Sequence, residues 1–164
     1  MNIVLVGMSG SGKTTVSYAL SELCGMERFD TDERIEQEYG IISEIFNSHG
    51  EKFFRDIETE IVKYFSYMQG VIISTGGGCL LRQKNVDLLK KAGKIVYLRT
   101  SVNELDKRLE GDKSRPLLLG DIKVKLKKMF SVRDPIYSAN ADLIVDTDGL
   151  SAEEVAKVIW ENIK

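Results

Sequence analysis

The chain has 164 residues, of which 43% are hydrophobic and 29% charged, and its formal net charge at pH 7 is −2. This size and composition predict one compact soluble domain, and the charge disfavours nucleic acid or an anionic membrane as the main partner. No apolar run approaches the roughly 18 residues that span a bilayer, and the N-terminus lacks the basic segment of a secretory signal. With two cysteines, Cys24 and Cys79, we expect a reduced, cytoplasmic protein.

Strand and helix patterns alternate along the chain. Short apolar runs predict buried strands at 3–6, 71–73, 95–98 and 143–145, with a further short strand ending near Phe29. Helical spacing predicts helices from near Lys13 to Gly25, over 31–46 with a break at Gly40, from Phe54 to Met68, and after the capping box Ser151-x-x-Glu154. This order predicts a parallel α/β sheet, in which ligands bind at the carboxyl ends of the strands.

The segment Gly7 to Thr14 matches the phosphate-binding pattern GxxxxGK[ST] and follows the first predicted strand. Backbone N–H groups of such a loop point at phosphate oxygens, and the next helix adds its positive dipole end. We expect Lys13 to reach the β- and γ-phosphates and the Thr14 hydroxyl to bind Mg²⁺. A glycine-rich turn without a ligand is the alternative. The nucleotide site is predicted to contain Gly7, Ser9, Gly10, Ser11, Gly12, Lys13, Thr14 and Thr15.

Two aspartates with one residue between them, Asp30 and Asp32, follow the second predicted strand. From a single turn they can face a Mg²⁺ ion and a reacting hydroxyl. We expect Asp30 to hold Mg²⁺ through water, and Asp32 to accept the acceptor's proton or hydrogen-bond its hydroxyl. The alternative is a structural role in which Asp30 or Thr31 caps the helix before Glu33. Capping and metal contact are compatible.

Three consecutive glycines, Gly76, Gly77 and Gly78, follow the third predicted strand. Each glycine costs conformational entropy, so a triplet in this position indicates close approach of the backbone to a ligand. A sharp turn without a ligand is the alternative. Cys79, beside the triplet, is a candidate for oxidation.

The polar segment from Asp112 to Pro116 lies between two helical patterns and carries Arg115. We expect a lid that excludes water and brings the charge of Arg115 to the triphosphate, as an arginine finger does. A plain surface loop is the alternative.

Two further arginines, Arg55 and Arg133, are candidates for the acceptor site. A planar guanidinium grips a carboxylate through two bonds, so a pair of arginines facing the acceptor pocket would select an acidic small molecule. The spacing of Arg55 and Glu58 also fits an ordinary ion pair within one helix. A solvated helix face is expected for four lysines, Lys123, Lys125, Lys127 and Lys128.

Six patterns are similar to those of the shikimate kinases, small members of the nucleoside monophosphate kinase-like group. In chain order they are Gly7-x-x-Gly10-x-Gly12-Lys13-Thr14, Asp30-Thr31-Asp32, Gly50-Glu51-x-x-Phe54-Arg55-x-x-Glu58, Gly76-Gly77-Gly78, Arg115-Pro116-Leu117-Leu118 and Arg133-x-Pro135-x-Tyr137. The resemblance runs almost end to end. It implies a three-layer α/β/α P-loop kinase fold with a central five-stranded parallel sheet. It also implies transfer of the γ-phosphate of ATP, with Mg²⁺, to the 3-hydroxyl of shikimate in aromatic amino-acid biosynthesis.

On the acceptor side, the resemblance implies roles for individual residues. Asp30 resembles the metal-side aspartate, and Asp32 the residue that contacts shikimate hydroxyls and serves as base. Arg55, oriented by Glu58, and Arg133 resemble the carboxylate-binding arginines. The substrate-side glycine loop is matched by Gly76, Gly77 and Gly78.

On the nucleotide side, the resemblance implies that Arg115 touches phosphate and that Arg108 lies near adenine, with the loop of Asp146 and Thr147 beside the ring. It implies a single P-loop kinase domain over residues 1–164, with substrate-binding helices around 31–60 and a lid around 111–120. The expected partners are shikimate and ATP, with no nucleic acid or membrane, and the expected state is a monomer.

Other assignments share the phosphate loop. A nucleotide kinase of the same fold would hold an acceptor phosphate where this chain is expected to hold a carboxylate, and a gluconate kinase is a small-metabolite alternative. A GTP-dependent switch needs an Asn-Lys-x-Asp motif, which the sequence lacks. A non-catalytic ATP-binding module is disfavoured by the presence of both Lys13 and Asp30.

Overall fold

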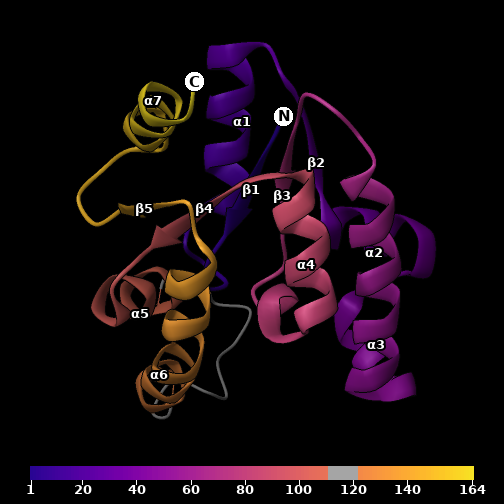
Figure 1. The fold of residues 1–164 in the computed structure, drawn as a ribbon. Coiled ribbons are helices and arrows are strands. Elements are labelled where there is room, and N and C mark those ends of the chain that lie inside the picture. Colours follow the sequence, from indigo (N-terminus) through magenta and orange to yellow (C-terminus); the bar gives the residue numbers. More distant parts are fainter. Residues whose placement is uncertain (111–121) are drawn as a thin grey trace.

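The computed structural model describes residues 1–110 and 122–164. Five strands form one parallel sheet in the order β2-β3-β1-β4-β5 (Figure 1). Their bounds are β1 Asn2–Val6, β2 Glu27–Asp30, β3 Val71–Ser74, β4 Gly93–Arg99 and β5 Leu143–Asp146. The predicted five-stranded parallel α/β sheet is therefore confirmed, and each predicted strand is present.

Helices connect the strands and cover both faces of the sheet (Figure 1). They are α1 Lys13–Cys24, α2 Thr31–Tyr39, α3 Ile42–Ser66, α4 Gln83–Ala92, α5 Val102–Glu110, α6 Ile122–Asn140 and α7 Ala152–Ile163, with a short 3₁₀ helix at Cys79–Leu81. None of the helices in the described part of the chain is long and apolar enough to cross a membrane.

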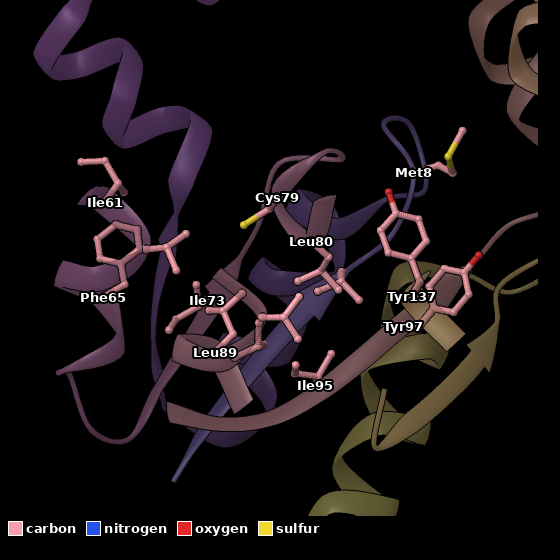
Figure 2. Packing of buried hydrophobic residues seen from close by; sticks show 14 of the residues in the cluster. Met8, Ile61, Phe65, Ile73, Cys79, Leu80, Leu89, Ile95, Tyr97 and Tyr137 are labelled. Carbon is pink, nitrogen blue, oxygen red and sulfur yellow. The ribbon is translucent and has the colours of Figure 1, made fainter. Parts of the chain in front are cut away.

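The two faces of the sheet bury different sets of side chains, because successive residues of a strand point to opposite sides. On β1, Ile3 and Leu5 pack with residues of α1 and α7, while Val4 and Val6 pack with residues of α3, α4 and α6. Figure 2 shows part of the second layer, from Ile61 and Phe65 on α3 across the sheet to Tyr97 and Tyr137. All five strands therefore lie between two helical layers.

The helix α3 differs from its prediction. It begins at Ile42 rather than at Phe54, because the chain continues through Gly50, whose backbone is not helical (φ 83°, ψ 172°). Two helical pieces are thus joined at a glycine that adopts the left-handed φ region without strain. The predicted break at Gly40 is confirmed, since Gly40 ends α2 with φ 92°.

The parallel register brings the carboxyl ends of the strands to one edge of the sheet. Ser74 at the end of β3 pairs with Leu5 of β1 and with Asp30 of β2, and Arg99 at the end of β4 pairs with Asp146 of β5. The segments that follow β1, β2, β3 and β5 therefore share this edge, where an open parallel sheet binds ligands.

Candidate active site

The phosphate loop runs from the end of β1 to the start of α1. Its glycines Gly7, Gly10 and Gly12 have φ values of 150°, 84° and 92°. A Cβ atom at Gly7 would lie 2.7 Å from the carbonyl oxygen of Leu98, so this position also has no room for a side chain. The loop conformation therefore depends on glycine, as a backbone cradle for phosphate requires.

A cavity of about 680 Å³ opens above this loop. It is lined by the predicted loop residues Ser9 to Thr15, by Asp30 and Asp32, by Gly76 and Gly77, and by Arg108 and Thr147. Residues that sequence reasoning did not assign also line it, on the side of α7: Val16, Leu150, Ala152 and Val155. The cavity thus has a polar end at the phosphate loop and an apolar end suited to a base.

Lys13 lies within the loop and is almost fully buried. Its Nζ donates hydrogen bonds to the carbonyl oxygens of Gly7 (2.7 Å) and Met8 (2.9 Å). Burial lowers the pKa of Lys13 to about 8, and the nearby carboxylates of Asp32 and Asp30 oppose that shift. Among the described residues, no carboxylate touches this buried ammonium, so it is well placed to bind a polyphosphate.

Thr14 and Asp30 face each other across the loop. The Thr14 hydroxyl donates to Oδ2 of Asp30 at 3.1 Å, while Oδ1 of Asp30 accepts from the backbone N–H groups of Asp32 (2.9 Å) and Glu33 (3.2 Å). Asp30 therefore caps α2 with one oxygen and meets Thr14 with the other. The capping alternative is confirmed, and the contact of Asp30 with Mg²⁺ stays a prediction.

The chemistry of this pair fits Mg²⁺, which prefers oxygen ligands and keeps several waters when it binds with nucleotide phosphates. Among the described residues, no group of three or more His, Cys, Asp or Glu side chains is arranged to hold a metal by itself. A site of one hydroxyl and one carboxylate agrees with an ion that arrives with ATP.

Asp32 stands where two cavities meet. It lines both the nucleotide cavity and a second cavity of about 550 Å³. Burial raises the pKa of Asp32 to about 6, with smaller upward contributions from Asp30 and Glu58. The carboxylate is thus ionised at neutral pH but more basic than an exposed aspartate, which suits contact with a reacting hydroxyl.

The second cavity brings the two candidate arginines together. Arg55 of α3 and Arg133 of α6 both line it, with the glycine loop and Glu58 between them. Arg55 donates from Nη1 to Oε1 of Glu58 at 2.9 Å, so the expected ion pair within the helix exists and the arginine still lines the cavity. Burial raises the pKa of the fully buried Glu58, and Arg55 opposes this shift.

The three glycines form the floor between these groups, and each makes a close contact. A Cβ atom at Gly76 would lie 2.7 Å from Oδ1 of Asp32, and one at Gly77 would lie 2.9 Å from Oγ of Ser9. One at Gly78 would lie 2.6 Å from Cζ of Arg55. A side chain at any position of the triplet would therefore force a functional side chain or the phosphate loop to move.

The groups predicted near adenine are only partly brought together. Arg108 lines the nucleotide cavity and donates to the carbonyl oxygen of Gly10 at 2.8 Å, and Thr147 lines it while sharing a 2.6 Å hydrogen bond with Thr100. Asp146 instead forms an exposed ion pair with Arg99, at 2.6 Å and 3.0 Å. The carboxylate of Asp146 therefore points to Arg99, and a contact of this residue with the nucleotide stays a prediction.

Arg115 and the predicted lid around 111–120 lie outside the described residues. Cys79, a candidate for oxidation from its position in the sequence, is fully buried, and burial raises its pKa well above the ordinary value. Because the thiolate is the reactive form, the structure disfavours oxidation at this cysteine.

Sequence reasoning missed the apolar wall of the second cavity. That wall comprises Met8, Ile42, Phe46, Phe54, Leu109, Ile122, Leu126 and Met129. Helical spacing gave no signal for it, because an apolar residue at that spacing looks the same whether it meets the core or a ligand. Lys125, predicted on a solvated face, is exposed and also lines this cavity.

Among known protein families, one has a sequence model that matches most of this chain. The sequence model of shikimate kinase matches residues 9–164. The chain belongs to the shikimate kinase family. The predicted resemblance is confirmed, and this kinase is accordingly an ATP-dependent phosphotransferase with an alcohol group as acceptor.

Individual relatives agree with the family model. The shikimate kinase of Thermodesulfovibrio yellowstonii is 43% identical over 160 residues, which are 96% of this chain and 92% of the relative. The shikimate kinase of Caldicellulosiruptor bescii is 41% identical over the same shares. A solved shikimate kinase from Acinetobacter baumannii, in complex with shikimate, superposes with a TM-score of 0.91 at 38% identity and covers 98% of this kinase and 90% of that chain.

Proposed function

We propose that this chain transfers the γ-phosphate of ATP to the 3-hydroxyl of shikimate, giving shikimate 3-phosphate and ADP in aromatic amino-acid biosynthesis. Membership of the shikimate kinase family supports the reaction. One observation of the structure carries the assignment of the site: Asp32 lies in the wall common to a phosphate-loop cavity and a cavity with two arginines. Donor and acceptor would therefore meet at this carboxylate.

On the donor side, the backbone N–H groups of the phosphate loop would bind the triphosphate. Lys13 would exchange the carbonyl oxygens of Gly7 and Met8, which it now contacts, for phosphate oxygens. Thr14 and Asp30 would hold Mg²⁺, Asp30 through water, and the bound ion would offset charge on the phosphates. Arg108 and Thr147 are our proposed contacts near adenine, with Asp146 in the same loop. Arg115 remains our prediction for a cation that reaches the transferred phosphate.

On the acceptor side, Arg55 and Arg133 would bind the carboxylate of shikimate. A guanidinium fork matches a carboxylate through two hydrogen bonds, whereas a neutral sugar offers no such partner. The glycine loop would let the ring approach the backbone, and the apolar wall would exclude water. Gluconate also carries a carboxylate, so membership of the shikimate kinase family, rather than the charge of the site, favours shikimate over gluconate.

Asp32 would accept a hydrogen bond from the 3-hydroxyl and take its proton as the new phosphate bond forms. Phosphoryl transfer depends mainly on alignment and charge neutralisation, so the proton need not leave early. A pKa of about 6 keeps Asp32 unprotonated at neutral pH. Its position beside Gly76 leaves it free to face the acceptor.

The test is ADP release with Mg²⁺ and ATP against a panel of acceptors. The panel contains shikimate, its methyl ester, gluconate, AMP, CMP and no acceptor. Turnover with shikimate, and a KM for the methyl ester at least about tenfold higher, is the expected result, because the ester keeps the hydroxyls but loses the charge. Turnover confined to a nucleotide or gluconate would overturn the acceptor assignment.

We further propose that the enzyme works as a cytoplasmic monomer with a single P-loop kinase domain. Two cavities of one chain would hold both small-molecule substrates, which supports the monomer. Light scattering coupled to size-exclusion chromatography tests the monomer.

A further inference from the structure

Arg133 lies in a turn of α6 that has fewer backbone hydrogen bonds than a regular helical turn. Pro135 lies within this helix, two residues after Arg133. A proline has no N–H to donate to the carbonyl group four residues earlier, and its ring crowds that group. The turn that presents Arg133 to the acceptor cavity therefore lacks one regular helix hydrogen bond, that to Ser131.

Two buried tyrosines, one on β4 and one on α6 itself, connect this part of the helix to the rest of the fold through their hydroxyl groups. Tyr97, in the middle of β4 and fully buried, donates from its hydroxyl to Oδ1 of Asp134 at 2.8 Å. Tyr137, one helical turn after Arg133, donates to the carbonyl oxygen of Gly77. The rings of Tyr97 and Tyr137 lie side by side, 4.9 Å between centroids, and their hydroxyls diverge toward these different partners (Figure 2).

The bond of Tyr97 joins the turn directly to a strand of the sheet, whereas that of Tyr137 joins the helix to the glycine loop. The phosphate loop follows β1 and the glycine loop follows β3, so both are fixed by the same sheet that carries Tyr97. Arg133 lies on a helix, so its place relative to that frame depends on contacts between α6 and the rest of the fold. Asp134, its immediate neighbour, makes the contact to a strand, and Tyr137 makes the one to the glycine loop. Neighbouring side chains on a helix point in different directions, so Asp134 can face β4 while Arg133 faces the cavity.

The Tyr97 hydroxyl stays a donor at every physiological pH, because burial and the Asp134 carboxylate raise the pKa of Tyr97 far above its ordinary value. A hydrogen bond from a buried phenol to a carboxylate is stronger than one between neutral groups. It is therefore able to define the position of the turn.

We propose that Tyr97 and Asp134 form a positioning pair that holds Arg133 in place to bind the acceptor's carboxylate. This inference rests on the proposed function, since it assumes that Arg133 binds that group. Neither member of the pair lines the cavity, so both act through the arginine.

The test compares Tyr97→Phe, Asp134→Ala, Asp134→Asn and the double variant Tyr97→Phe with Asp134→Ala. For each, the KM values for shikimate and ATP, kcat, and the Kd for shikimate by calorimetry without ATP are measured. Ser21→Ala is the control for a lost hydrogen bond, since Oγ of Ser21 donates to the carbonyl oxygen of Met26 at 2.6 Å at the far end of α1.

If the pair positions Arg133, loss of its hydrogen bond in Tyr97→Phe or in Asp134→Ala should raise the KM and Kd for shikimate about fivefold. The KM for ATP should not change. The double variant should be no worse than either single one. Asp134→Asn, which still accepts a bond but a weaker, neutral one, should have a KM for shikimate between those of the wild type and Asp134→Ala. Ser21→Ala should lose thermal stability without a change in the KM for shikimate.

Two results would overturn the pair. One is an unchanged KM for shikimate in both Tyr97→Phe and Asp134→Ala, and the other is an Asp134→Asn variant as weak as Asp134→Ala. Either can occur while the wild type phosphorylates shikimate normally, which leaves the proposed function standing. A wild type without shikimate turnover overturns the proposed function and the role of the pair with it.

Discussion

The guanidinium of Arg55 occupies the space that a side chain on Gly78 would need. A Cβ atom there would lie 2.6 Å from Cζ of Arg55, although the backbone of Gly78, with φ −93° and ψ 7°, is open to other residues. Glycine is thus required at this position by the arginine and not by the backbone.

Gly78→Ala is therefore expected to displace Arg55 without unfolding the protein. The KM for shikimate should rise at least about tenfold, since a 1 Å shift of a binding group costs much of a charge-assisted contact, while the KM for ATP stays constant. Steady-state kinetics with a thermal melt as control measure this. An alanine variant with the wild-type KM would show that Arg55 does not bind the acceptor from this position.

Arg55→Ala should weaken acceptor binding by about 2–5 kcal/mol, the range for removing one partner of a desolvated charge pair. Glu58 would at the same time lose the partner of its buried carboxylate, so some stability should be lost as well. Calorimetric titration of shikimate reports the first effect and urea unfolding the second. The double variant Arg55→Ala with Glu58→Gln is the matched control. It should recover stability but not binding, and recovered binding would place Arg55 outside the acceptor site.

Lys13→Met should lower kcat at least about 100-fold, because one positioned cation is lost from the phosphates. The fold should be at least as stable as the wild type at pH 7. The reason is that burial lowers the pKa of Lys13 from 10.5 to about 8, so the cost of burying its charge grows as the pH falls from 10.5 to about 8 and is fully present at pH 7. ADP release and urea unfolding at pH 7 measure the two effects. Retained turnover would remove Lys13 from the mechanism.

Asp32→Asn should abolish most turnover and stabilise the fold in a pH-dependent way. The pKa of Asp32 is raised from 3.8 to about 6, so ionisation of this group opposes folding above that range and has no effect where both states are protonated. The free energy of unfolding of the variant should exceed that of the wild type by about 1–3 kcal/mol at pH 8, and this difference should shrink as the pH falls from 6 to 4. Urea unfolding at pH 8, 6 and 4.5 shows the trend, and a constant difference would contradict the raised pKa.

The same pKa predicts the pH dependence of catalysis. For the wild type, kcat/KM for shikimate should fall below about pH 6, roughly tenfold per pH unit, as the base becomes protonated. A profile that stays flat down to pH 5 would argue that Asp32 only hydrogen-bonds the acceptor.

The sheet and the phosphate loop could be predicted from sequence because their signals are local. Apolar runs mark β1, β3, β4 and β5, and the loop from Gly7 to Thr14 combines glycines with Lys13 in a fixed spacing. The start of α3 was wrong because Gly50 joins two helical pieces across a non-helical residue, and spacing rules read such a glycine as an end.

The acceptor site was less predictable because its contacts are distant in sequence. The spacing of Arg55 and Glu58 left open whether the arginine forms an ion pair or binds a ligand. The fold permits both at once, since Nη1 of Arg55 donates to Glu58 while the arginine also lines the cavity. The bond from Tyr97 to Asp134 links residues 37 positions apart. No local sequence pattern predicts such a contact.

The most direct measurement follows the phosphorus atoms of a reaction mixture of the wild-type protein, ATP, Mg²⁺ and shikimate by ³¹P NMR. A shikimate phosphomonoester resonance that grows in equal amount with ADP, and that is lost in Lys13→Met and strongly slowed in Arg55→Ala, is the predicted result. ATP that stays intact with shikimate, or that yields inorganic phosphate and ADP without a phosphomonoester, would contradict a shikimate kinase.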